Sequence, residues 1–343
     1  MSNRIAFVFP GQGSQAVGMG ADLAAQIPAA RAVFAEADAA LEFPLSELCF
    51  NGPETTLRET INTQPAIATT SLAALAALRV ALHPDDADAL LVPDFVAGHS
   101  VGEYTALIAA GAIAFADGIR LIRERGRLMH HEGTICPGGM AAVLGLDTVQ
   151  LIAICNQAQK DVANNPTVVT LRAHHLGAGC VVVANDNAPG QLIISGEQTA
   201  LARAMELAQA AGAKRVLPLT VSGAFHSPVM APAAPALTLA VAKAHVQNAK
   251  TPLISNITAR PISLAEDIFP ELTAQIAAPV RWTETIEWLV KDGGVTAFVE
   301  LGSGQVLAGL IKRIAKGIPV YATGTPAEVT ATAQNLQDHG FVI

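Results

Sequence analysis

The chain lacks the features that usually direct a protein to nucleic acid. Aromatic residues make up 4% and charged residues 15% of its 343 residues, and no tract of lysine and arginine occurs. Lys and Arg together number 21 against 29 Asp and Glu, which gives a net charge of −8. A phosphate backbone is bound by basic patches interleaved with aromatic side chains, so nucleic acid is not an expected partner.

Cysteine is scarce and widely spaced. Cys49, Cys136, Cys155 and Cys180 include no CxxC pair. Disulfide frameworks and zinc sites need closely spaced or regularly repeated cysteines. The sequence therefore predicts buried thiols in a reducing compartment, and no metal site.

No apolar run is long and uninterrupted enough to predict a membrane span, although 51% of the residues are apolar. The longest, Ile67 to Leu82, contains three hydroxyl residues and Arg79. The N-terminus, Met1 to Arg4, runs directly into the strand-like Ile5 to Phe9, which is too short for a secretory signal. These observations predict no membrane association and a cytoplasmic location.

The most informative stretch runs from Asp94 to Tyr104. It joins a short apolar run to Gly98-His99-Ser100-Val101-Gly102, and an alanine-rich helical segment follows. This order is typical of a nucleophile elbow, in which a tight strand-to-helix turn exposes the serine hydroxyl beside helix N–H groups. Those N–H groups can stabilise an oxyanion. The alternative is a glycine-rich turn with an incidental serine.

A second glycine-rich turn follows the first predicted strand, Ile5 to Phe9. Gly11 and Gly13 match the beginning of a dinucleotide fingerprint, which requires a later strand ending in an acidic residue. Asp38 instead lies in the helix-like stretch Ala29 to Leu41. A loop that presents backbone N–H groups to an oxyanion is the better interpretation.

The pattern of predicted strands and helices changes near Met140 and returns to the earlier pattern near Leu219. Between them the pattern reads β-α-β-β-α-β, the order of a ferredoxin-like domain. We therefore predict a small inserted domain over residues 139–213 and a large domain from residues 1–138 and 214–343. Within the insert, the polar stretch Lys160 to Gly179 is predicted to be a mobile surface excursion. In the large domain, Ala66 to Leu82 and Pro228 to Val246 are predicted helices.

A serine nucleophile needs a base, and nine histidines are available. The neighbours in the pairs His130-His131 and His174-His175 diverge on a helix, so neither pair predicts a chelate. His226 lies in loop-forming sequence at a strand-to-helix junction, which makes it the best placed base. A core or capping histidine is the alternative. No strand-Asp-turn unit stands between Ser100 and His226, so a dyad oriented by a carbonyl or amide oxygen is predicted, with acyl transfer through a serine ester.

Four arginines, Arg120, Arg123, Arg125 and Arg127, lie on one predicted helix. At 100° per residue they cannot share a face. Most are expected on a solvated rim, with one or two pointing into a cleft.

Five motifs together resemble the malonyl-CoA:acyl carrier protein transacylase family, and the likeness runs from about Ile5 to Ile314. They occur in the family's order: Phe9-Pro10-Gly11-Gln12-Gly13-Ser14-Gln15, Gly98-His99-Ser100-Val101-Gly102-Glu103-Tyr104, Arg125-Gly126-Arg127-Leu128-Met129, Ala224-Phe225-His226-Ser227 and Pro279-Val280-Arg281-Trp282. The resemblance implies an α/β fold, with an α/β-hydrolase-like large domain built on a parallel sheet and an inserted ferredoxin-like small domain.

The resemblance also implies roles for individual residues. Ser100 would be the nucleophile and His226 the base, with the oxyanion bound by the backbone N–H groups of Gln12 and Val101. Arg125 would bind the malonyl carboxylate, and the carbonyl of Gln275 would orient His226. Three further residues would contact the substrate, namely Met129, Asn187 and Phe225.

The implied reaction moves a malonyl group from malonyl-CoA to Ser100 and then to the phosphopantetheine thiol of acyl carrier protein, for fatty acid synthesis. No bound cofactor is implied; the carrier is a transient partner, and a monomer is expected. Alternatives are a discrete acyltransferase of a polyketide synthase, a malonate decarboxylase subunit and, more distantly, a serine hydrolase or a non-catalytic scaffold. The chain departs from the family at Gly302-Ser303-Gly304-Gln305, where Gly-Pro-Gly-Lys is usual, and in the length of the excursion.

Overall fold

A computed structural model describes residues 3–86 and 90–341. The chain forms two compact units. The first comprises the chain as far as Gly126, then Val241–Phe269 and the chain from Glu284 onward; the second comprises Arg127–Ala240 and Pro270–Thr283. The second unit contains the whole of the predicted insert, residues 139–213, together with flanking segments. The predicted domain boundaries themselves remain a prediction.

The first unit is built on a largely parallel sheet with the strand order β10-β9-β1-β2-β7-β8. The central strand β1 pairs in parallel with β2 and β9, and all five of its residues are buried, as its continuous apolar run predicts. Among the described residues, β7 and β8 form the antiparallel pair of this sheet. Its strands are β1 (Ile5–Phe9), β2 (Phe95–Gly98), β7 (Leu253–Ile254), β8 (Pro261–Ile262), β9 (Ala297–Glu300) and β10 (Val320–Ala322).

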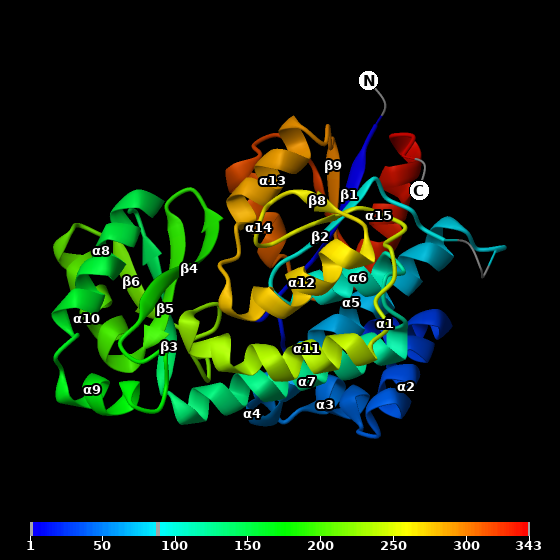
Figure 1. Cartoon of the computed structure of the whole chain (residues 1–343). Helices are drawn as coiled ribbons and strands as arrows, with labels where there is room; N and C mark the ends of the chain where they lie inside the picture. Colours follow the sequence, from blue (N-terminus) through cyan, green and yellow to red (C-terminus); the bar gives the residue numbers. More distant parts are fainter. Residues whose placement is uncertain (1–2, 87–89, 342–343) are drawn as a thin grey trace. The chain divides into compact units, whose positions relative to one another are not determined.

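Helices pack around this sheet, and two of them, α5 and α6, bear directly on the site described below (Figure 1). The helices within the unit are α1 (Ala21–Gln26), α2 (Pro28–Leu41), α3 (Leu45–Asn51), α4 (Glu54–Leu57), α5 (Thr60–Leu82), α6 (Val101–Ala109), α14 (Val306–Ile314) and α15 (Pro326–Asp338). Four more continue from one unit into the other: α7 (Phe115–Ile135), α11 (Ala234–Lys243), α12 (Ala265–Ala274) and α13 (Trp282–Lys291).

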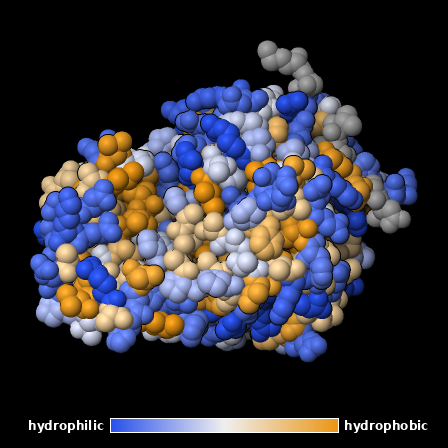
Figure 2. Space-filling view, in the orientation of Figure 1, coloured by the Kyte–Doolittle hydropathy of each residue, from blue (hydrophilic) through white to orange (hydrophobic). Residues whose placement is uncertain are grey.

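Helix α5 accounts for the most apolar part of the sequence. It begins at Thr60, earlier than predicted, and accommodates Pro65 within its length. By length and composition it could cross a bilayer, but 67% of its most apolar window is buried inside the unit. It packs against α2, α6 and α15, so it is a core helix. The high apolar content is therefore largely interior, and Figure 2 shows apolar residues on the visible surface interspersed with polar ones.

The second unit contains an antiparallel sheet with the strand order β4-β5-β3-β6. Helices α8 and α10 pack together on one face of it, over a core that includes Val143, Leu151 and Ile194 (Figure 1). This is the predicted ferredoxin-like arrangement, and the predicted α/β fold class is confirmed. The elements are β3 (Gly138–Leu144), α8 (Thr148–Asp161), α9 (Pro166–Arg172), β4 (Val181–Ala188), β5 (Gln191–Glu197), α10 (Gln198–Ala210), β6 (Arg215–Pro218), and the 3₁₀ helices η1 (Pro228–Ala233) and η2 (Gln275–Ala277).

The excursion from Lys160 to Gly179 is more ordered than its polar sequence suggests. It forms helix α9, which has Pro166 at its first position and an N-cap at Asn165 whose side chain accepts a hydrogen bond from the Thr167 N–H. Its C-terminal end then turns inward, because His175 is 5% exposed. The prediction of a mobile surface segment missed this inward turn.

The predicted helix from Pro228 to Val246 is divided into two elements. Its first part is the 3₁₀ helix η1, which contains Pro232, and the α-helix α11 begins only at Ala234 and ends at Lys243. Proline cannot donate an N–H bond inside a helix, so the proline-rich first turns adopt the shorter 3₁₀ form. The four cysteines are free and buried, as predicted.

Candidate active site

Ser100 occupies a sharp turn between strand β2 and helix α6. Its backbone has φ +55° and ψ −112°, outside the conformations that most L-residues adopt, and α6 begins at the next residue, Val101. A Cβ at Gly98 would lie 1.9 Å from the Gly102 carbonyl carbon, and one at Gly102 would lie 2.1 Å from the Phe9 carbonyl oxygen. Neither position tolerates a side chain. The turn therefore has the geometry of a nucleophile elbow, and the Val101 N–H is among the donors that a helix start leaves available.

Asn256 braces this turn, and no local pattern in the sequence predicts that role. Its Oδ1 accepts a hydrogen bond from the Ser100 N–H at 2.9 Å, and its Nδ2 donates to the Gly98 carbonyl at 2.7 Å. The Asn256 N–H in turn donates to Oε1 of Glu103, at 2.8 Å, and both Asn256 and Glu103 are fully buried. One amide thus joins both sides of a strained turn, which limits the movement of Ser100.

Arg125 is the buried member of the arginine-rich helix α7. It is 0% exposed, whereas Arg120 and Arg127 are exposed and Arg123 is partly exposed. Its Nη2 donates to Ser100 Oγ at 3.3 Å. Burial lowers the pKa of Arg125, and the neighbouring Tyr104 and Glu103 oppose that shift. A buried guanidinium therefore lies directly beside the candidate nucleophile.

Gln64 of helix α5 holds the guanidinium from the other side. Its Oε1 accepts a hydrogen bond from Arg125 Nη1 at 2.8 Å. The two helices approach closely at Gly126, where a Cβ would lie 2.7 Å from the Thr60 carbonyl oxygen. The missing side chain of Gly126 thus serves the packing of α7 against α5, and this packing sets the contact between Gln64 and Arg125.

The loop after β1 touches the elbow. A Cβ at Gly11 would lie 2.5 Å from the His99 carbonyl oxygen, so the two turns are in close contact. Ser14 Oγ donates to the Gly11 carbonyl at 3.1 Å and shapes the loop. Gln12, the predicted oxyanion donor, is partly buried in this loop.

His226 lies in the second unit, where two carbonyl groups face its Nδ1. The carbonyl oxygens of Gln275 and Ala278 are each 3.0 Å from Nδ1. Two acceptors at one ring nitrogen require that nitrogen to carry the proton, so the lone pair of the neutral ring lies on Nε2. The backbone of His226 is also held, with φ +56° and an N–H bond to the Ile276 carbonyl. Backbone groups therefore fix both the ring and the main chain of His226.

The other predicted substrate-contacting residues also lie in the second unit. Phe225 and Met129 are buried, and a Cβ at Gly223 would lie 3.2 Å from Phe225 Cε1 and 3.7 Å from the Met129 carbonyl oxygen. Asn187 is a partly exposed residue of β4. Thus Ser100, Val101, Gln12 and Arg125 belong to the first unit, and His226, Gln275, Phe225, Met129 and Asn187 belong to the second.

A buried carboxylate lies at the end of β9, beside the departure from the family motif. Glu300 is 0% exposed and accepts hydrogen bonds from the N–H groups of Leu307 at 3.0 Å and Ala308 at 2.7 Å, at the start of α14. Burial raises its pKa to about 7, although the two N–H bonds oppose the shift. Within residues 3–86 and 90–341, no group of three or more His, Cys, Asp or Glu residues is arranged to hold a metal ion.

A parallel α/β unit that ends one strand in a serine elbow defines the class of enzymes that use a serine for acyl chemistry. The chain belongs to the acyl transferase domain family, whose model matches residues 6–330. It is similar to the malonyl CoA-acyl carrier protein transacylases of Bacillus subtilis, at 40% identity over 98% of both chains, and Escherichia coli, at 38% identity over 96% of this chain and 99% of the relative. The predicted resemblance is thereby confirmed, and the chain is an acyltransferase.

Solved structures agree with this assignment. The malonyl CoA-acyl carrier protein transacylase of Coxiella burnetii superposes with a TM-score of 0.87 at 34% identity, covering 97% of this chain and 98% of that one. A malonyl-transacylase solved in complex with its type II PKS acyl-carrier protein superposes with a TM-score of 0.84 at 38% identity, covering 97% of this chain and 100% of that one.

Proposed function

We propose that the chain transfers a malonyl group from malonyl-CoA to the phosphopantetheine thiol of acyl carrier protein through an ester on Ser100. The observation that carries the proposal is the buried guanidinium of Arg125 beside the Ser100 hydroxyl. A planar guanidinium can hold a carboxylate through two parallel hydrogen bonds, and malonyl is an acyl group that ends in a carboxylate. A simple serine hydrolase has no need of this charge.

The reaction takes place in two half-reactions with His226 as the base. Nε2 of His226 takes the proton of Ser100 Oγ as the oxygen attacks the thioester carbonyl, and the N–H groups of Gln12 and Val101 stabilise the oxyanion. The C–S bond breaks, and the CoA sulfur leaves with the proton from His226. The carrier thiol then gives its proton to His226 and attacks the ester, and Ser100 recovers its proton as it leaves.

The two carbonyl groups at Nδ1 orient the ring of His226 and fix its tautomer. They hold the Nδ1–H tautomer, in which the lone pair lies on Nε2, and they stabilise the imidazolium that forms in each half-reaction. No bound cofactor or metal is required by these steps. The full reaction is carried by protein groups and the two thiols.

The partner and pathway follow from the relatives. The malonyl-transacylase solved with its carrier protein supports acyl carrier protein as a transient partner, and the transacylases of two bacteria support fatty acid synthesis as the pathway. We place the enzyme in the cytoplasm as a monomer. Service to a polyketide carrier is the second candidate, because that same complex contains a type II PKS carrier protein.

Intact-protein mass spectrometry with malonyl-CoA tests the proposal. The wild type should gain one malonyl group and lose it on addition of malonyl-free holo carrier protein, whereas Ser100→Ala should gain none. His226→Ala should form the adduct far more slowly. A stable adduct on Ser100→Ala would contradict the assignment, and rapid hydrolysis of the wild-type adduct with no transfer to the carrier would favour the serine hydrolase. Comparing carrier proteins of fatty acid and polyketide synthesis then distinguishes the pathways.

A further inference from the structure

The loop that carries His226 is held by residues that follow it in the chain. Ser227 Oγ donates to the Ala224 carbonyl at 2.6 Å, and the Val229 N–H donates to Ser227 Oγ at 3.3 Å. The loop therefore closes on itself around His226, and it continues directly into η1. Any element that fixes Val229 also fixes the position from which His226 is presented.

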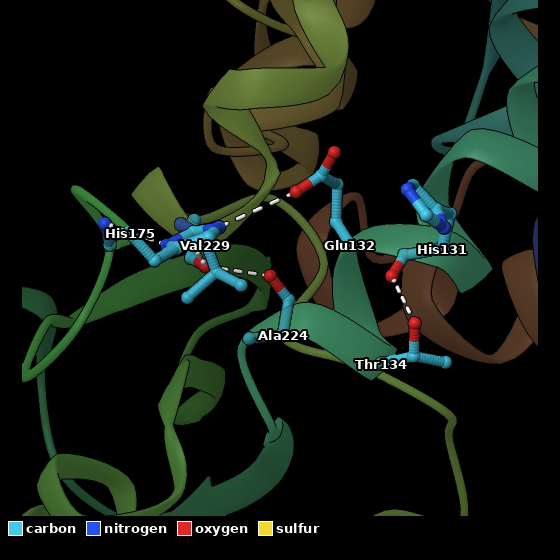
Figure 3. Close-up of polar contacts among 8 residues, drawn as sticks. His131, Glu132, Thr134, His175, Ala224 and Val229 are labelled. Atoms are coloured by element: carbon cyan, nitrogen blue, oxygen red, sulfur yellow. Dashed lines mark hydrogen bonds and ion pairs between the residues drawn. The ribbon is translucent and has the colours of Figure 1, made fainter. Parts of the chain in front are cut away.

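A buried pair, Glu132 and His175, lies next to this loop in the same unit (Figure 3). Nε2 of His175 is 3.4 Å from Oε2 of Glu132, and the two residues are 5% and 6% exposed. The Gly177 N–H donates to Nδ1 of His175 at 3.0 Å. Because Nδ1 accepts that bond, the ring proton lies on Nε2 and is donated to Glu132. Both nitrogens of His175 are thus engaged, one with helix α7 and one with the end of the excursion.

Gly177 connects this pair to the loop. A Cβ there would lie 2.6 Å from Val229 Cα and 2.7 Å from its backbone nitrogen, so the excursion packs directly on the residue that closes the loop. Figure 3 shows Glu132 reaching toward His175 from α7.

Helix α7 meets the other end of the same loop. A Cβ at Gly133 would lie 2.4 Å from the Ser222 carbonyl oxygen and 3.3 Å from Gly223 Cα. Gly133 adjoins Glu132 in the sequence, so one turn of α7 both touches the start of the loop and binds His175. The segment from Ser222 to Val229 is therefore held between α7 and the end of the excursion.

We propose that His175 is a positioning residue for His226: bound to Glu132, it presses Gly177 against Val229 and so fixes the loop that presents the base. This inference rests on the proposed role of His226. It gives the long excursion a function in the second unit, because the excursion supplies the contact that closes the His226 loop.

Steady-state kinetics of malonyl transfer test the proposal. His175→Ala should lower kcat between about 10-fold and 100-fold, the range expected for a misplaced catalytic group, with KM for malonyl-CoA within about 2-fold of the wild-type value. Glu132→Ala should act similarly, whereas Glu132→Gln, which keeps an acceptor oxygen, should retain most of the activity. His174→Ala changes the exposed neighbour and should leave kcat unchanged.

A double-mutant cycle with His226→Ala separates positioning from a general structural role. If His175 acts through His226, then His175→Ala should cause no further loss of the residual transfer activity of His226→Ala. An undiminished loss in that background, or a wild-type kcat in His175→Ala, would overturn the inference. If His175→Ala does not fold, His175→Leu, which fills the space but makes neither hydrogen bond of His175, is placed in the same cycle with the same criteria. Full activity of His226→Ala alone would instead refute the proposed function.

Discussion

Replacement of Arg125 by alanine is the sharpest test of how the enzyme selects its acyl group. The guanidinium is fully buried and held by Gln64 on one side and Ser100 on the other. If it pairs with the malonyl carboxylate, its loss leaves a buried charge without a partner. Such a loss costs roughly 3–5 kcal/mol.

That free energy corresponds to a decrease of roughly two to four orders of magnitude in kcat/KM for malonyl-CoA. Acetyl-CoA has no carboxylate for the guanidinium to bind, so its transfer should fall by less than about 10-fold or even rise. Arg125→Lys should recover only part of the malonyl activity, since a point charge cannot reproduce two parallel hydrogen bonds.

The assay is a competition for the carrier thiol with malonyl-CoA and acetyl-CoA, read by mass spectrometry of the acylated carrier. Arg127→Ala serves as the matched control, because Arg127 is exposed on the same helix. Equal losses for malonyl and acetyl transfer in Arg125→Ala would refute the carboxylate-binding role. They would mean that the arginine acts by holding Ser100, through the contact at 3.3 Å.

Three further predictions concern the elbow, the pocket and the buried carboxylate. Asn256→Asp keeps an acceptor for the Ser100 N–H but loses the donor to the Gly98 carbonyl. Labelling of Ser100 by a fluorophosphonate should therefore slow by at least about 10-fold. Asn248 accepts a hydrogen bond from the Ala265 N–H, and the control variant Asn248→Asp should not affect labelling. Phe225 should narrow the space near the acyl α-carbon, so malonyl should be preferred over methylmalonyl by about 1–3 kcal/mol, and equal specificity constants would contradict this. Because the native pKa of Glu300 is raised from 4.5 to about 7, the native state binds the proton more tightly, and the free energy of unfolding should fall by roughly 3 kcal/mol between pH 4.5 and 7. Denaturant titrations of Glu300→Gln should lack this fall, and an unchanged pH profile would show that the carboxyl does not titrate in that range.

The parts of the site that could be predicted from sequence are those whose geometry is local. Gly98 and Gly102 flank Ser100 within five residues, and the crowding that demands glycine there comes from the turn itself and the adjacent strand. Helix periodicity predicts that one or two of the four arginines of this helix point inward, but it does not say which. The family pattern alone selects Arg125.

The parts that could not be predicted depend on contacts between distant segments. Asn256 lies 156 residues from Ser100, and no local pattern connects the two. Glu103 stands inside the elbow motif, but its role as an acceptor for the Asn256 N–H requires the position of β7 in the sheet. His175 follows a polar stretch that resembles a loop, and only a contact 43 residues back in the chain, with Glu132, shows why it is buried.

The proposed functional residues of each unit have a consequence for substrate selection. In the first unit, the nucleophile and the cation that would select a carboxylate are in direct contact, through Arg125 and Ser100. In the second, two carbonyl groups hold His226, the proposed base, and Phe225 is its neighbour in the chain. The residue proposed to select the acyl group by its charge therefore also contacts the nucleophile. The residue proposed to select the acyl group by its size adjoins the base. Substitutions of Arg125 should thus change the preference between charged and uncharged acyl groups. Substitutions around His226 should change the rate for all acyl groups together, or the preference between small and bulky acyl groups.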